Sequence, residues 1–235
     1  DELASRLNLQ LYSKTRASEI EAIQHFPVFV PLPYLARIAP GDIRDPLLRQ
    51  VLPTLDEDLL DPKFSLDPLR EISSQLGPGL LKKYRGRVLL VTTGSCAINC
   101  RYCFRRHFPY EQAPKSSRHW QPSIAEIAKD GSIEEVILSG GDPLLVSDRQ
   151  LDDLVARIAA IPHVKRLRVH TRLPVVIPQR ITAPLIDALI KPELNTVVVI
   201  HSNHANELCS KVGAAMGELQ QAGIALLNQS VLLAG

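Results

Sequence analysis

The chain has 235 residues, of which 45% are hydrophobic and 22% are charged, and its formal net charge is +2. This length suits one large domain, or one domain with an added segment, and the composition excludes a mainly disordered chain. No run of about 18 apolar residues could span a membrane, and no secretory signal follows Asp1. The 27 Lys and Arg nearly balance the 25 Asp and Glu, which argues against nucleic-acid binding through bulk charge. We expect a cytoplasmic globular protein.

Residues 1–80 differ from the rest of the chain. The pattern of residues 17–23 predicts a short helix, and prolines recur from Pro27 to Pro68. Each proline removes a backbone donor and moves the preceding residue out of the helical region, so long helices are not expected here. We interpret residues 1–80 as a helical, loop-rich N-terminal extension.

Residues 81–235 alternate between apolar runs and helix-like segments. The runs read as strands buried on both faces, and they fall at residues 88–91, 135–138, 167–170, 196–200 and 224–227. Helices are predicted between them, at residues 123–129, 148–160, 183–190 and 206–222. Strands that alternate with helices are typical of a parallel α/β sheet, either doubly wound or closing toward a barrel.

The chain ends just past the fifth predicted strand, at Gly235. A closed barrel needs more strands, and an open sheet ending here would leave a long apolar edge uncovered. We therefore expect the natural C-terminal part to be missing.

Three of the four cysteines lie within eight positions. Cys96, Cys100 and Cys103 directly follow the first predicted strand, whereas Cys209 stands alone in a predicted helix and is assigned no chemistry. Disulfides belong mainly to secreted folds, so clustered thiols at the carboxyl end of a parallel strand predict a metal site. Three thiolates can bind a [4Fe–4S] cluster and leave one iron open. Zinc with His107 as a further ligand is the alternative.

The spacing C-x3-C-x2-C, with Tyr102 before the last cysteine, resembles the radical SAM superfamily. The wider run 96–108 is similar to the lysine 2,3-aminomutase family, most of all to its branch that makes β-lysine for elongation factor P. The similarity continues through residues 82–87, 139–143, 171–174, 177–178, 201–207 and 228–233. The resemblance implies a partial (β/α) radical SAM barrel.

The resemblance also implies a set of cofactor-binding residues. For S-adenosylmethionine they are Tyr102, Ser139, Gly140, Gly141, Asp142, His201, Asn203 and Gln229. Taken alone, the stretch 139–143 is a turn whose glycines allow a ligand close to the backbone, and His201 is a structural residue at a strand end. His170 and Arg172 end the third strand, and the sequence leaves them equally open to a structural and a functional interpretation.

The resemblance places substrate and a second cofactor near basic residues. Arg105 is expected to bind the carboxylate of lysine, for which a planar guanidinium is well suited; Arg106 is either its helper or a solvated neighbour. Lys83 and Arg87 are expected on the phosphate of pyridoxal 5′-phosphate. The alternative is a basic helix end before a strand, chiefly for Lys82 and Arg85.

The implied activity is an isomerase reaction that converts L-α-lysine to (R)-β-lysine for elongation factor P and its ligase. An electron donor such as flavodoxin or ferredoxin is expected, and neither nucleic acid nor membrane. The lysine that bonds pyridoxal phosphate is expected beyond Gly235, so the fragment alone is predicted to be inactive. Three alternatives remain: a radical SAM enzyme for glutamate or a peptide, a regulatory or structural metal-binding module, and, more weakly, an RNA-binding protein.

Overall fold

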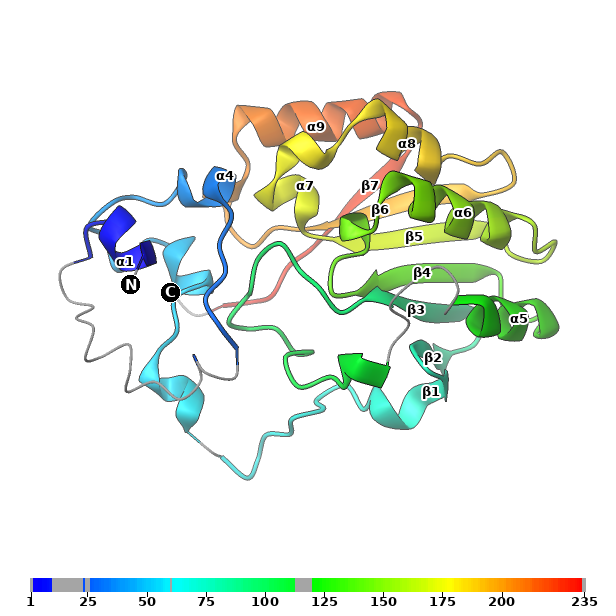
Figure 1. Ribbon diagram of the computed structural model, residues 1–235, viewed down its shortest axis with the longest axis horizontal. Coiled ribbons are helices and arrows are strands. Elements are labelled where there is room, and N and C mark those ends of the chain that lie inside the picture. Colours follow the sequence, from blue (N-terminus) through cyan, green and yellow to red (C-terminus); the bar gives the residue numbers. More distant parts are fainter. Residues whose placement is uncertain (1, 10–22, 24–25, 60, 113–119, 234–235) are drawn as a thin grey trace.

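The computed structural model describes residues 2–9, 23, 26–59, 61–112 and 120–233. One sheet of seven strands, in the order β1 to β7, runs through the molecule (Figure 1). The strands are β1 (Gln75–Gly77), β2 (Leu80–Tyr84), β3 (Arg87–Thr93), β4 (Glu135–Gly140), β5 (Arg166–Thr171), β6 (Asn195–His201) and β7 (Ala225–Gln229). Strands β1 to β3 pair antiparallel and β3 to β7 pair parallel. The sheet is not closed, which confirms the expected α/β fold with a partial barrel.

The crossovers between the parallel strands contain the predicted helices. They are α5 (Gln121–Lys129), α6 (Asp148–Ala159), α8 (Ala183–Leu189) and α9 (Ser210–Gln221), together with the shorter α7 (Leu173–Val176). Three of them, α6, α8 and α9, cover one face of the sheet (Figure 1). The single helix predicted at residues 206–222 is wrong, because the 3₁₀ turn η8 (Ala205–Glu207) is separated from α9 by Leu208 and Cys209.

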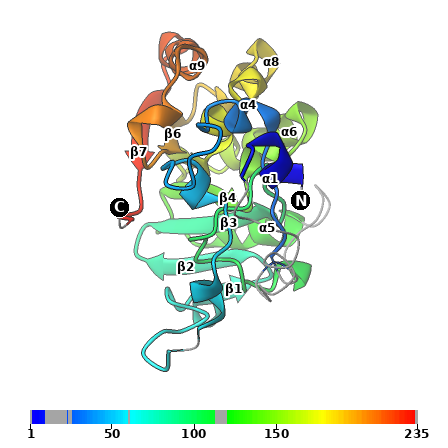
Figure 2. The ribbon, with the colours of Figure 1, turned by 90° about the vertical axis from the view of Figure 1, so that its left-hand side faces the viewer.

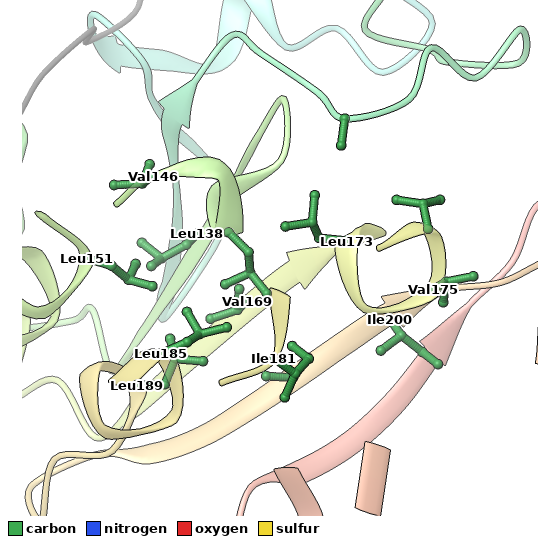
Figure 3. Packing of buried hydrophobic residues seen from close by; sticks show 14 of the residues in the cluster. Leu138, Val146, Leu151, Val169, Leu173, Val175, Ile181, Leu185, Leu189 and Ile200 are labelled. Atoms are coloured by element: carbon green, nitrogen blue, oxygen red, sulfur yellow. The ribbon is translucent and has the colours of Figure 1, made fainter. Parts of the chain in front are cut away.

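The strands alternate between two environments. Leu138 and Val169 lie on the side of Leu151 and Leu185 from the covering helices, and Ile200 lies near Val175 and Ile181, all within one buried cluster (Figure 3). The intervening residues point to the other face of the sheet, as the two-residue period of a strand requires. The first set buries one continuous apolar layer, and the other set is free to line a cavity.

The N-terminal region consists of short helices and loops. Among the described residues these are α1 (Glu2–Arg6), α4 (Leu32–Leu35), η1 (Leu48–Gln50), η2 (Leu55–Asp58) and η3 (Ile72–Ser74). The helix predicted at residues 17–23 lies outside the described residues, apart from Ile23. The region lies across the carboxyl ends of the parallel strands (Figures 1 and 2). Tyr34 and Leu48 belong to the same buried cluster as the sheet, so the described part of this region shares the core of the sheet.

The basic stretch before the first predicted strand is not a helix end. Lys82 lies in β2, which forms an antiparallel hairpin with β3 through a turn at Gly86, where φ is +79°. Leu80 and Leu81 are buried in this pairing, which favours a strand over the basic helix end that the sequence left open. Further 3₁₀ turns lie at η4 (Tyr110–Gln112), η6 (Pro143–Leu145) and η7 (Pro178–Arg180). Among the described residues, no helix has the length and apolar character to cross a membrane.

Candidate functional site

A cavity of about 370 Å³ opens at the carboxyl ends of the parallel strands. Of the predicted site residues it is lined by Lys83, Arg87, Cys96, Cys100, Tyr102, Cys103, Arg105, Ser139, Gly140, Gly141, Asp142, His201 and Gln229. Asn203 lies instead in a neighbouring cavity of about 470 Å³, which shares Tyr102 as a wall. Apart from Asn203, the structure therefore gathers around one space the residues that the sequence assigned to metal, cofactor and substrate.

The N-terminal region holds the cysteine loop in place. The amide of Asn99 donates to Phe29 O at 3.0 Å, and its side chain donates to Pro27 O at 2.8 Å. The guanidinium of Arg101 forms an ion pair with Glu57, with Nη2 and Oε2 2.6 Å apart. Glu57 was not identified from the sequence, because one carboxylate in the short 3₁₀ turn η2, 44 residues before Arg101, gives no local signal.

The three clustered cysteines have free thiols. Burial raises the pKa of the Cys103 thiol, so a metal would have to displace its proton. Among the described residues, no three His, Cys, Asp or Glu side chains converge on a point where they could hold a single metal ion. A cluster of several irons needs no common point, since each thiolate binds a different iron. Three thiols on one cavity-lining loop fit such a cluster.

The two glycines after β4 lie against the cysteine loop. At Gly140 φ is +123°, and an added Cβ would lie 2.5 Å from Thr93 O. At Gly141 an added Cβ would lie 2.2 Å from Ser95 O. The amide of Gly141 donates to Thr93 O at 2.7 Å, and Tyr110 Oη donates to Gly140 O at 2.9 Å. The close contact with the cysteine loop is thus one reason for glycine at positions 140 and 141. The sequence suggested another reason, the close approach of a ligand to the backbone.

Asp142 joins the ends of β4 and β5. Its buried carboxylate accepts hydrogen bonds from the amides of Leu144, Arg172 and Leu173 and from Thr171 Oγ1, the last at 2.6 Å. Burial raises the pKa of this carboxyl, and the four hydrogen bonds oppose the rise. Its side chain is therefore engaged within the protein, and a contact between Asp142 and S-adenosylmethionine stays a prediction.

Tyr102, His201 and Asn203 meet across about 100 residues of sequence. Tyr102 Oη lies 3.0 Å from His201 Nε2, and the two rings stack with centroids 5.5 Å apart. Asn203 Nδ2 donates to Tyr102 Oη at 2.7 Å. Burial, aided by the charge of Arg172, lowers the pKa of His201 to about 4, so the imidazole is neutral at pH 7. The three side chains together form a polar and uncharged surface beside the cysteine loop.

Arg105 is buried and bound on one edge. Its Nε and Nη2 each donate to Glu71 at 2.7 Å, and Nη1 donates to Ser139 Oγ at 2.7 Å. A guanidinium has five N–H donors, so these three bonds leave two for a ligand. Glu71 precedes the sheet and was not identified from the sequence. Ser139, predicted on S-adenosylmethionine, here orients Arg105.

Basic residues surround another part of the cavity. Lys83 Nζ donates to Leu69 O, and Arg87 Nε lies 3.4 Å from the buried carboxylate of Glu135. The same carboxylate pairs with Arg168 at 2.6 Å. Since Lys83 and Arg87 both line the cavity, their positive charge is available to an anionic group there. Neither Glu135 nor Arg168 was singled out from the sequence.

The last predicted residue, Gln229, contacts the end of β5. Its Oε1 lies 3.0 Å from His170 Nδ1, and burial lowers the pKa of His170. The neighbouring Asn228 exchanges two 3.0 Å hydrogen bonds with the backbone of Ser202. Gln229 thus lines the cavity, whereas Asn228 joins β7 to the end of β6.

The chain has recognisable relatives among known proteins. The radical SAM superfamily model matches residues 90–207. The chain is 47% identical to the L-lysine 2,3-aminomutase of Escherichia coli (strain K12), over 99% of this chain and 68% of that protein. It is 47% identical to the L-lysine 2,3-aminomutase of Haemophilus influenzae, over 92% and 64% respectively. It is 40% identical to that of Clostridium subterminale, over 86% and 49%. The chain thus spans between half and about two thirds of the length of these curated relatives.

Proposed function

The chain belongs to the lysine 2,3-aminomutase family of the radical SAM superfamily, and from this we propose that the protein converts L-α-lysine to (R)-β-lysine. One observation carries the proposal. The three thiols of the cysteine loop line the same cavity as Arg105 and the basic pair Lys83 and Arg87. An electron-transfer site, a carboxylate site and a phosphate site thereby share one space, which is what an amino-acid radical rearrangement with pyridoxal phosphate requires.

In this proposal Cys96, Cys100 and Cys103 hold a [4Fe–4S] cluster. When bound, the cluster supplies the single electron that cleaves S-adenosylmethionine into methionine and a carbon radical. The protein's part is to fix the loop through Asn99 and Arg101 and to enclose the space above it. Enclosure keeps water away from a reactive species.

The residues at the strand ends bind S-adenosylmethionine. Carbonyl groups at Ser139, Gly140 and Gly141 receive its ammonium group. Tyr102 and His201, with Asn203 behind them, form the stacked wall beside the loop. Gln229 completes this set from β7. A neutral His201 suits a place next to the positively charged sulfonium, since an imidazolium there would repel it.

The substrate and pyridoxal phosphate occupy the remaining cavity. Arg105 uses its two unengaged N–H groups on the lysine carboxylate, while Glu71 keeps the guanidinium from turning away. Lys83 and Arg87 bind the phosphate, although Glu135 already neutralises part of the Arg87 charge. That the 235-residue chain by itself does not catalyse the mutase reaction stays a prediction.

The wider role in this proposal is to supply β-lysine to the ligase that modifies elongation factor P. A flavodoxin or ferredoxin would deliver the electron. The test is anaerobic incubation of the intact enzyme with L-lysine, pyridoxal phosphate, S-adenosylmethionine and a reductant, followed by chiral chromatography. (R)-β-lysine is the expected product. Turnover of L-glutamate or a peptide in place of lysine would contradict the proposed substrate, and no S-adenosylmethionine cleavage at all would contradict the reaction class.

A further inference from the structure

Arg172 is a buried arginine that none of the proposed binding steps uses. It follows β5 directly and is 7% exposed. Its backbone amide donates to Asp142 Oδ2 at 2.8 Å, so the residue is fixed to the end of β4. The buried carboxylate of Asp142 therefore helps to hold Arg172 in place.

The guanidinium of Arg172 points at a cysteine of the cluster loop. Its Nη1 donates to Cys100 Sγ at 2.6 Å. The rings of Tyr34 and Tyr102 flank it, with their centroids 5.4 and 5.6 Å from its central carbon. Two aromatic faces stabilise the cation and restrict its motion, so its direction toward the sulfur is defined.

A buried carboxylate faces the other end of the same guanidinium. Glu207 is fully buried, and its Oε2 lies 3.4 Å from Arg172 Nη2. Gln50 bridges the two residues: its Oε1 accepts from Arg172 Nη2 at 2.7 Å, and its Nε2 donates to Glu207 Oε1 at 2.7 Å. Hydrogen bonds thus connect Cys100, Arg172, Gln50 and Glu207 in that order, and the last three side chains are buried.

From these contacts we propose that Arg172 is a positioning residue for Cys100 that raises the reduction potential of the cluster, and that Glu207 opposes it. The inference rests on the proposed function, because it requires the three thiols to carry the cluster. One-electron reduction by an external donor adds negative charge to the cluster. A permanently positive group hydrogen-bonded to a ligating sulfur favours that reduced state, and in a site of low dielectric the effect is large. A negative group behind the arginine weakens it.

The two residues therefore have effects of opposite sign, which separates tuning from simple support of the fold. Arg172→Gln removes the positive charge and should lower the midpoint potential. At a fixed applied potential the reduced-to-oxidised ratio should fall at least tenfold, which for one electron is 59 mV. Glu207→Gln keeps the shape of the side chain and its hydrogen bond to Gln50 but removes the negative charge. The midpoint potential of the cluster should therefore rise in this variant. Loosened packing alone would not move the two variants in opposite directions.

The experiment is a mediated redox titration of the reconstituted protein, followed by electron paramagnetic resonance, with iron content measured on each sample. Arg180→Gln is the matched control, because Arg180 is a partly buried arginine that binds Leu144 O and Asp148 instead; its potential should equal that of the wild type. Shifts of opposite sign in Arg172→Gln and Glu207→Gln support the inference. Equal potentials, or shifts of the same sign, at full iron content overturn it.

The same measurements distinguish failure of the inference from failure of the proposed function. If Arg172→Gln retains no iron, Glu207→Gln decides alone: a higher potential supports the inference, and an unchanged or lower one overturns it. A wild-type protein that takes up no iron at all contradicts the proposed function itself and removes the basis of the inference with it.

Discussion

Arg105 and Glu71 are joined by two hydrogen bonds of 2.7 Å, although 34 residues separate them and both side chains are buried. The pair links the loop before the sheet to the loop that carries the cysteines. It also fixes which edge of the guanidinium remains open to the cavity. In the proposed enzyme, the carboxylate of the substrate meets an arginine whose direction is set before binding.

This pair predicts a binding defect in Glu71→Gln. An amide cannot match both N–H donors, so Arg105 is freed to turn, and the KM of the intact enzyme for lysine should rise about tenfold with a smaller change in kcat. Removing one partner of a buried ion pair should also cost about 3 kcal/mol of unfolding free energy. The exposed Glu134→Gln is the control and should change neither quantity. A normal KM in Glu71→Gln would contradict the assigned role.

Gly141→Ala tests the contact between β4 and the cysteine loop. The new Cβ would lie 2.2 Å from Ser95 O, so the loop must shift, and iron retention after reconstitution should fall severalfold. Gly217→Ala in α9 is the control, because its added Cβ meets nothing within 4 Å. In the interior of a helix that change should stabilise the fold by about 0.5–1 kcal/mol. Full iron content in Gly141→Ala would show that the loop tolerates displacement.

His201 predicts a pH dependence of stability. Its pKa is about 4 in the fold against an ordinary value near 6.5, chiefly because of burial. The unfolded chain thus binds a proton that the folded chain does not, and stability is lost as the pH falls from about 6.5 toward 4. By pH 5 the loss from this group should be about 2 kcal/mol.

The measurement is urea unfolding of the metal-free protein at pH 7.5 and pH 5. His201→Gln keeps a hydrogen-bonding side chain beside Tyr102 but cannot titrate. Its unfolding free energy should therefore fall less than that of the wild type between the two pH values. An equal fall in both proteins would mean that His201 does not contribute to the pH dependence.

Glu57→Gln tests whether the ion pairs of Glu57 hold the cysteine loop in place. Glu57 pairs with both Arg101 and Arg106, at 2.6 and 2.8 Å, and removing its charge leaves two arginines without their carboxylate. We expect the rate of iron loss to a chelator to increase several-fold, since local opening of the loop becomes easier. Glu126→Gln, which breaks only an exposed pair with Lys129, should leave that rate unchanged.

The sequence predicted the parts of the fold that depend on local pattern. The five parallel strands were found because buried parallel strands are continuous apolar runs, and α6 was found because Leu151, Leu154, Val155 and Ile158 recur on one helical face and are all fully buried. Strand β2 was missed because its buried part is only Leu80 and Leu81, followed by charged residues. Two apolar residues are too few to show the repeat by which a strand is recognised in a sequence.

Most of the residues that hold the site residues in place could not be predicted in this way. The cysteines and strand-end residues were identified through motif resemblance, but Glu57, Glu71, Gln50 and Glu207 were not. Each acts on a residue at least 34 positions away, as in the contact between Gln50 and Glu207. Contacts of this kind have no spacing to recognise, since they depend on how the N-terminal region lies across the strand ends.

The most direct test of the central claim is the iron content and magnetic resonance spectrum of the anaerobically reconstituted protein. We expect about four irons per chain, a number that Cys100→Ser should reduce. Adding S-adenosylmethionine should also change the spectrum of the reduced cluster, because three thiolates leave one iron open to that ligand. A protein without bound iron, or a reduced cluster whose spectrum is indifferent to S-adenosylmethionine, would contradict it.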